Sequence, residues 1–208
     1  MDDLVYLNHN SWFLYRKNFI DWFDDDMYNE LWSYKPAEKH EIHVFGKTCK
    51  LPRYQQSYGA INYVYSGIVA DVKPMTPLLL KIKDEIDKMW PEFIFNSCLI
   101  NWYTSGQDYI SFHSDDEKTI VAGSPVIGLT FCKGDPRTLR IKEKKTKKTI
   151  YDLKLENRSL YMMGGQGFQT YYLHGIPKTT KNGERVSLTF RQFSRKTTSS
   201  FFEVASHE

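Results

Sequence analysis

Short runs of alternating apolar and polar residues fill the second half of this chain. After residue 93 they predict eight strands, separated by turns with Gly, Pro, Asp or Asn: Cys98–Tyr103, Tyr109–His113, Pro125–Cys132, Thr138–Lys142, Thr149–Leu155, Ser159–Met163, Tyr171–His174 and Arg185–Phe193. Eight strands at this spacing are typical of a jelly roll, the cupin-like double-stranded β-helix. We therefore expect a mainly β protein with flanking helices and a jelly-roll core over residues 93–193.

Residues 1–92 show a more mixed pattern. Aromatic residues from Trp12 to Phe23 recur at nearly helical spacing, so we expect a short strand at Val5-Tyr6 and helical segments on both sides of the acidic run Asp24–Asp26. A hairpin at about 42–58, a strand at about 61–69 and a helix at about 76–90 follow; Pro77 suits the first helical turn. Residues 194–208 are rich in Ser, Thr and Lys, which predicts a flexible tail on a single structural unit.

Charge and cysteine content indicate the compartment and the possible partners of the protein. The net charge is only +3, but lysines cluster at Lys142, Lys144, Lys145, Lys147 and Lys148. This cluster is either a solvated hairpin or a contact for a phosphate backbone. Three widely spaced cysteines indicate a reducing compartment. Neither a signal peptide nor an apolar run of about 18 residues is present, so we expect an intracellular protein, nuclear or cytoplasmic, without a membrane partner.

A His-x-Asp pair, His113 and Asp115, ends one of the predicted strands. On a strand these two side chains point the same way and supply two ligands of the 2-His-1-carboxylate site of non-haem Fe(II) oxygenases. His174, downstream, is the candidate third ligand; taken alone it could equally be a hydrogen-bonded core histidine. The sequence therefore predicts an iron site at these three residues.

The last predicted strand has two distinct faces. Arg185, Ser187, Thr189 and Arg191 alternate with Val186, Leu188 and Phe190, so one face is polar and the other apolar. Asn101 and Tyr103 occupy alternate positions of an earlier strand. A cavity lined by two arginines, a Tyr and an Asn suits a small dianionic acid, because Arg binds carboxylates bidentately.

Together these motifs resemble the AlkB family of Fe(II)/2-oxoglutarate dioxygenases, which remove alkyl groups from nucleobases. The resemblance covers about residues 42–193 and is greatest to the vertebrate branch that repairs double-stranded DNA. That branch shares Val44-Phe45-Gly46-Lys47, Pro52-Arg53 and a segment like Tyr63-Val64-Tyr65-Ser66-Gly67. Ser187, where the family commonly has Asn, and Tyr65, in place of a Phe, depart from the pattern.

The resemblance implies a role for each matching residue. Iron is held by His113, Asp115 and His174, and 2-oxoglutarate by Asn101, Tyr103, Arg185, Thr189 and Arg191. The flipped base is bound by a set that comprises Phe45, Gly46, Lys47, Arg53, Tyr63, Val64, Tyr65, Asp116 and Glu117. Among these, Phe45 is the wedge that fills the gap left by the base. The physical argument agrees, since a base inside a duplex must be extruded to reach a buried metal.

The implied activity is oxidative dealkylation of bases such as 1-methyladenine and 3-methylcytosine in DNA. It consumes O₂ and 2-oxoglutarate and releases succinate, CO₂ and an aldehyde. Double-stranded DNA is the expected partner and a monomer the expected state. Two alternatives remain open: the same chemistry on RNA or on a protein side chain, because a shared fold does not fix the substrate, and a catalytically silent nucleic-acid-binding module.

Overall fold

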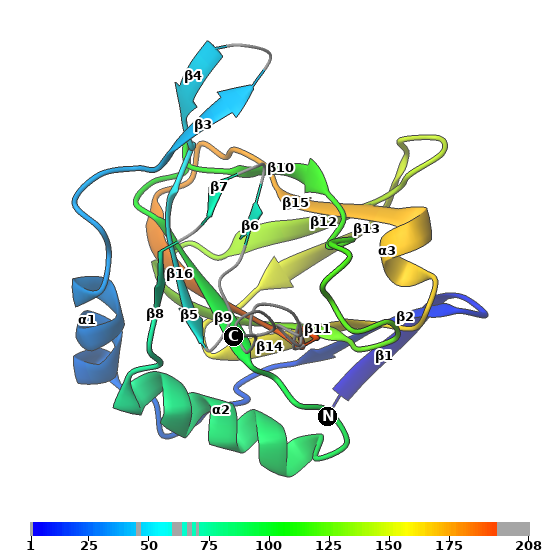
Figure 1. Cartoon of the computed structure of the whole chain (residues 1–208), viewed down its shortest axis with the longest axis horizontal. Coiled ribbons are helices and arrows are strands. Elements are labelled where there is room, and N and C mark those ends of the chain that lie inside the picture. The colour runs from blue at the N-terminus through cyan, green and yellow to red at the C-terminus, as the bar shows by residue number, and fades with distance from the viewer. Residues whose placement is uncertain (1, 45–46, 60–63, 66–67, 70, 195–208) are drawn as a thin grey trace, which may run out of the picture.

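Two β-sheets form the body of the protein in this computed structural model (Figure 1). The structure describes residues 2–44, 47–59, 64–65, 68–69 and 71–194. The larger sheet has the strand order β1 (Asp2–Asn8), β2 (Ser11–Arg16), β14 (Ser159–Gly164), β11 (Val126–Gly134), β16 (Gly183–Arg191), β9 (Ser97–Tyr103), β5 (Tyr54–Gly59) and β8 (Val72–Lys73). The smaller sheet has the order β10 (Ile110–His113), β15 (Tyr172–Ile176), β12 (Arg137–Glu143) and β13 (Thr149–Leu155).

The eight strands β9 to β16 confirm the strands predicted after residue 93, within a few residues at each end. They are divided between the two sheets in the manner of a jelly roll, with β9, β11, β14 and β16 in the larger sheet and the other four in the smaller, which confirms the predicted fold class. Strands from the first 73 residues supply the other half of the larger sheet, which therefore spans the domain boundary predicted at residue 92. The two sheets pack face to face through apolar side chains such as Val126 and Met163 from one and Leu139 and Ile141 from the other.

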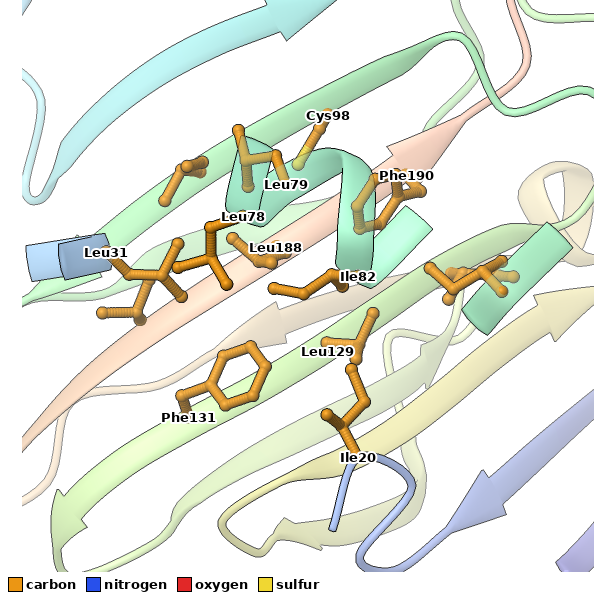
Figure 2. Packing of buried hydrophobic residues seen from close by; sticks show 14 of the residues in the cluster. Ile20, Leu31, Leu78, Leu79, Ile82, Cys98, Leu129, Phe131, Leu188 and Phe190 are labelled. Carbon is orange, nitrogen blue, oxygen red and sulfur yellow. The ribbon is translucent and has the colours of Figure 1, made fainter. Parts of the chain in front are cut away.

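Two helices cover the opposite face of the larger sheet (Figure 1). Helix α1 (Asp25–Ser33) begins after Asp24, whose side chain accepts a hydrogen bond from the Met27 backbone N–H. Helix α2 (Pro77–Met89) is capped by Thr76 and confirms the predicted helix. Figure 2 shows Leu79 and Ile82 of α2 packed against Leu188 and Phe190 of β16. No helix in the described part of the chain is long and apolar enough to cross a membrane.

The helix predicted before the acidic run is wrong. Residues Ser11–Arg16 form strand β2, in which fully buried positions alternate with partly buried ones. Phe13 and Tyr15 pack between the two sheets, whereas Trp12 and Leu14 pack toward the helices. Because both faces of the strand contact apolar groups, its sequence lacks the polar alternation that marks a half-exposed strand.

The segment between β2 and α2 also differs from its prediction. The hairpin is shorter than expected: β3 (Glu41–Val44) pairs with β4 (Lys47–Lys50), while β5 joins the larger sheet. The single strand predicted at 61–69 is wrong, since β6 (Val64–Tyr65) and β7 (Ile68–Val69) pair with each other as antiparallel strands. A short helix, α3 (Phe168–Tyr171), precedes β15 and was not predicted. Of the tail predicted at residues 194–208, only Ser194 is described, and its backbone N–H donates to the Thr119 carbonyl; the rest lies outside the described residues.

Candidate active site

The three predicted metal ligands meet between the sheets at the end of β10. His113 on β10 pairs directly with His174 on β15, so the two imidazoles are cross-strand neighbours. Asp115 follows β10 in the loop rather than on the strand, and its carboxylate oxygens lie 3.7 Å from the Nε2 atoms of both histidines. One ligand atom from each residue falls within 4.8 Å of the other two. This spacing fits a single metal ion.

The protonation of these residues also suits a metal. Burial, with His113 and Arg191 nearby, lowers the pKa of His174 to about 3, which leaves the neutral imidazole that binds metals. His113 Nδ1 donates to the Ser111 carbonyl at 2.9 Å and so directs Nε2 toward the site. Burial by itself raises the pKa of Asp115, but Arg191 and the histidines outweigh it and hold this pKa below its ordinary value. Two imidazoles and a carboxylate are the donor set of non-haem Fe(II).

Two residues hold Asp115 in place. Arg191 Nη2 donates to Asp115 Oδ1 at 2.8 Å, and the side-chain oxygen of Gln169 accepts the Asp115 backbone N–H at 2.8 Å. Asp115 Oδ2 is buried and has no hydrogen-bond partner among the described residues, so it remains available to a metal ion. Gln169 lies on the unpredicted helix α3, and nothing in the sequence around it marked this contact.

The polar face of β16 lines the same cavity, as its alternation predicted. Val186, Leu188 and Phe190 are fully buried toward the helices. All five residues predicted to hold the cosubstrate line the cavity with the metal ligands: Asn101, Tyr103, Arg185, Thr189 and Arg191. The strand register places Arg185 beside Tyr103 and Ser187 beside Asn101.

Arg185 is a deeply buried charged group in this cavity, and part of its guanidinium lacks a hydrogen-bond partner among the described residues. Its side chain is 1% exposed, and its guanidinium lies 4.9 Å from the centre of the Tyr103 ring. Nη2 donates to the hydroxyls of Thr130 and Ser187, while Nε and Nη1 have no hydrogen-bond partner among the described residues. A buried charge with unpaired donors is costly unless an anion completes it. The residues present therefore fit a carboxylate ligand such as 2-oxoglutarate.

Comparison with known proteins agrees with this geometry. The sequence profile of the 2OG-Fe(II) oxygenase superfamily matches residues 10–191. This chain belongs to that superfamily. Membership implies Fe(II) and 2-oxoglutarate as the groups that the enzyme uses, and the His113–Asp115–His174 cluster is a possible site for the iron.

Relatives place this dioxygenase in the AlkB family. DNA oxidative demethylase ALKBH2 of Bos taurus is 34% identical over 159 residues, covering 73% of this chain and 56% of the bovine protein. ALKBH2 of Arabidopsis thaliana is 30% identical over 220 residues, covering 91% of this chain and 66% of the plant protein. Alpha-ketoglutarate-dependent dioxygenase alkB homolog 3 of Mus musculus is 31% identical over 150 residues, covering 67% of this chain and 51% of that protein. The dioxygenase thus matches about half to two thirds of the length of these relatives.

The fold has a relative among solved structures as well. The structure of OsALKBH1 superposes with a TM-score of 0.63 at 16% identity, covering 91% of this chain and 100% of that one. At this identity the likeness shows the shared fold, a jelly-roll oxygenase, and nothing about the substrate.

The predicted base-binding residues of the dioxygenase fall into two groups. Phe45, Gly46 and Tyr63 lie outside the described residues; Lys47, Val64 and Tyr65 are described only by their backbone, in β4 and β6. The rest are Arg53, Asp116 and Glu117, and the structure describes their side chains.

Those three residues lie around the metal ligands. Arg53 is buried in the cavity wall, where its Nε donates to Asn101 Oδ1 at 2.6 Å. Asp116 and Glu117 line a second hollow, between the loop after β10 and α3, which also borders Asp115. Arg53 is therefore close to the predicted cosubstrate site, and the two acids lie next to the predicted iron site. Their contact with a base stays a prediction.

Proposed function

We propose that this dioxygenase removes alkyl groups oxidatively from N-alkylated bases in DNA, such as 1-methyladenine and 3-methylcytosine. The observation that carries the proposal is the single cavity in which the His-Asp-His cluster faces two buried arginines. The relatives named DNA oxidative demethylase supply the substrate class. DNA repair takes place inside the cell, in the nucleus or cytoplasm, and we expect the enzyme to act as a monomer.

In this proposal each part of the cavity has its own task. His113, Asp115 and His174 hold iron; when bound, iron with 2-oxoglutarate and O₂ supplies the hydroxylation of the alkyl carbon, after which aldehyde is released. Asn101, Tyr103, Arg185, Thr189 and Arg191 hold and orient the cosubstrate. The intact set of ligands and arginines argues against a catalytically silent module.

Charge around the mouth of the site favours a nucleic-acid substrate. The lysine cluster lies at the β12–β13 turn, and β12 pairs with the ligand strand β15, Ile141 opposite His174. Lys144 Nζ lies 3.4 Å from Asp116, so the cluster reaches the loop that carries the metal ligand. Lys145, Lys147 and Lys148 remain exposed and are suited to phosphate groups. Asp116 and Glu117 favour an alkylated base that carries positive charge.

Mass spectrometry of methylated oligonucleotides tests the proposal. Single- and double-stranded DNA and RNA are incubated with enzyme and Fe(II), with and without 2-oxoglutarate, and with the His174→Ala variant as the inactive control. Loss of the methyl group from DNA that requires 2-oxoglutarate is the expected result. Demethylation of RNA alone would make the protein an RNA demethylase, and 2-oxoglutarate turnover without any nucleic-acid product would point to a protein substrate.

The preference for duplex DNA rests on Phe45 and has its own test. The paired residues Val44 and Lys47 flank Phe45 and Gly46 in the sequence. If Phe45 fills the gap left by the flipped base, Phe45→Ala should slow repair of duplex DNA by about 10-fold or more, since unstacking a base step costs a few kcal/mol. Single-stranded DNA, already open, should lose much less. Equal losses on both substrates, measured with one preparation, would remove the wedge from the proposal.

A further inference from the structure

One row of residues that crosses the larger sheet contributes two side chains to the wall of the cosubstrate cavity, Tyr161 and Thr189. Tyr161 on β14 lies opposite Gly128 on β11, and Gly128 lies opposite Thr189 on β16. Facing side chains in neighbouring strands point to the same side of a sheet. Tyr161 and Thr189 therefore project into the same space, with a glycine between them.

Gly128 leaves room for the phenol of Tyr161. A Cβ atom at position 128 would lie 2.1 Å from Tyr161 Cζ and 2.4 Å from its hydroxyl oxygen. The far end of the ring thus lies directly over Gly128 and extends toward β16. Phe13 on β2 supports the ring from the other side, with centroids 6.1 Å apart and planes inclined by 17°. The ring position is fixed by packing on both sides.

The Tyr161 hydroxyl has no structural task in the described part of the protein. It makes no hydrogen bond there, although Tyr161 is 5% exposed and lines the cavity with Arg185 and Thr189. Burial raises the pKa of Tyr161 to about 12, so the group keeps its proton and acts as a donor near neutral pH. The hydroxyl opens onto the cavity, where it can donate a hydrogen bond to a ligand.

Arg185 brings its unpaired donors toward the same place. Its guanidinium donates to Ser187 on β16 and to Thr130 on β11, which face each other across the two strands. This pair lies two residues along the strands from the row that contains Tyr161 and Gly128. Arg191, by contrast, is bonded to the metal ligand Asp115. The two arginines therefore mark two ends of the cavity, and Tyr161 shares the end that is remote from the metal.

We propose that the Tyr161 hydroxyl donates a hydrogen bond to the carboxylate of 2-oxoglutarate that is remote from the iron, beside Arg185. No motif of the sequence assigned a role to this residue. The inference rests on the cosubstrate that the superfamily implies and is independent of which substrate is dealkylated. Since binding alone tests it, a failure of the DNA proposal would leave it intact.

Calorimetry with Mn(II) in place of iron tests the contact without turnover. Tyr161→Phe keeps the ring and its packing and removes only the donor. Loss of a hydrogen bond to a charged group should raise the Kd for 2-oxoglutarate by roughly 10-fold to 100-fold. Binding of 2-oxobutyrate, which lacks the remote carboxylate, should be unchanged. Tyr15→Phe is the matched control, because the Tyr15 hydroxyl lies one strand away and bonds to the backbone of Lys154 and Glu156.

Each contrary result overturns the proposal in a distinct way. An unchanged Kd in Tyr161→Phe shows that the hydroxyl makes no contact, and an equal loss with 2-oxobutyrate places the contact at the metal end. The same loss of affinity in Tyr15→Phe shows that the effect comes from general loosening of the core and not from a contact with 2-oxoglutarate. If the wild-type protein binds no 2-oxoglutarate, the cosubstrate assignment fails together with the role of Tyr161.

A second variant tests the position of the ring. Gly128→Ala should weaken 2-oxoglutarate binding, because its new methyl group occupies the place of the phenol. In a Tyr161→Leu background, where no ring lies over residue 128, the same change should have little further effect. Equal losses from Gly128→Ala in both backgrounds would show that Gly128 is needed for another reason.

Discussion

Arg185 offers the clearest test of the cosubstrate site. Arg185→Lys keeps the positive charge but replaces the planar fork by a single ammonium group. Nε and Nη1 are the donors without a partner among the described residues, so they are the two that a carboxylate would engage. Losing one of two charge-assisted hydrogen bonds costs about 1.5–3 kcal/mol, or roughly 10-fold to 150-fold in the Kd for 2-oxoglutarate.

Thermal unfolding with Mn(II) and 2-oxoglutarate measures this loss. At a 2-oxoglutarate concentration about 100 times the wild-type Kd, the ligand stabilises the native state by about 2.7 kcal/mol, or roughly 5–10 °C in Tm for a domain of this size. For Arg185→Lys the same concentration should give only about 0.3–1.3 kcal/mol, a shift below about 5 °C. The Tm of the ligand-free variant, measured alongside, separates ligand binding from folding.

Arg191→Lys provides the internal comparison. Among the described residues Arg185 donates to Thr130 and Ser187 and not to the triad, so Arg185→Lys should leave the Mn(II) affinity unchanged. Arg191→Lys replaces the guanidinium that bonds to Asp115 by a shorter ammonium group and should weaken Mn(II) binding as well. A full wild-type shift in Arg185→Lys would refute the role of this arginine. Weakened Mn(II) binding in that variant would show that the two arginines do not serve separate ends of the cavity.

Three further predictions concern the surroundings of the site. Gln169→Ala removes the acceptor of the Asp115 N–H and should weaken Mn(II) binding about 10-fold to 100-fold. The control Gln166→Ala, at an exposed neighbouring position, should leave Mn(II) binding unchanged. Equal Mn(II) affinities of the Gln169→Ala variant and the wild type would refute the positioning role of Gln169. Changing Lys145, Lys147 and Lys148 to Gln should reduce the slope of log K against log salt for DNA binding by about 0.9 per lysine, and an unchanged slope would favour a solvated hairpin. Asp108→Asn should cost about 1.5–3 kcal/mol in urea unfolding at neutral pH. Lys39 and Thr104 lower the pKa of Asp108, against the effect of burial, so its contribution is present above about pH 4 and is lost as the pH falls; a difference that persists near pH 3 would contradict this.

The sequence alone determined the parts of this protein that depend on local pattern. Alternation along residues 185–191 gave the polar and apolar faces of β16, and both faces lie where predicted. The helical stripe after Thr76 gave α2. The His-x-Asp pair with His174 predicted three residues that do come together as a possible metal site. In each case neighbouring residues, or a motif of fixed order, carry the information.

Only the tertiary structure decided how distant strands meet. Strand β14 is buried along its whole length, so no alternation in its sequence shows which side chains face the cavity. The position of Tyr161 over Gly128, and of both beside Thr189, follows from the register of three strands far apart in the chain. The same holds for β2, which is apolar on both faces, so that its sequence pattern resembles that of a buried helix. It also holds for Gln169, whose side chain bonds to Asp115 from α3. Such contacts depend on which segments pair and in which register. A single sequence gives the residue at each position but does not show which residue lies opposite it in the sheet.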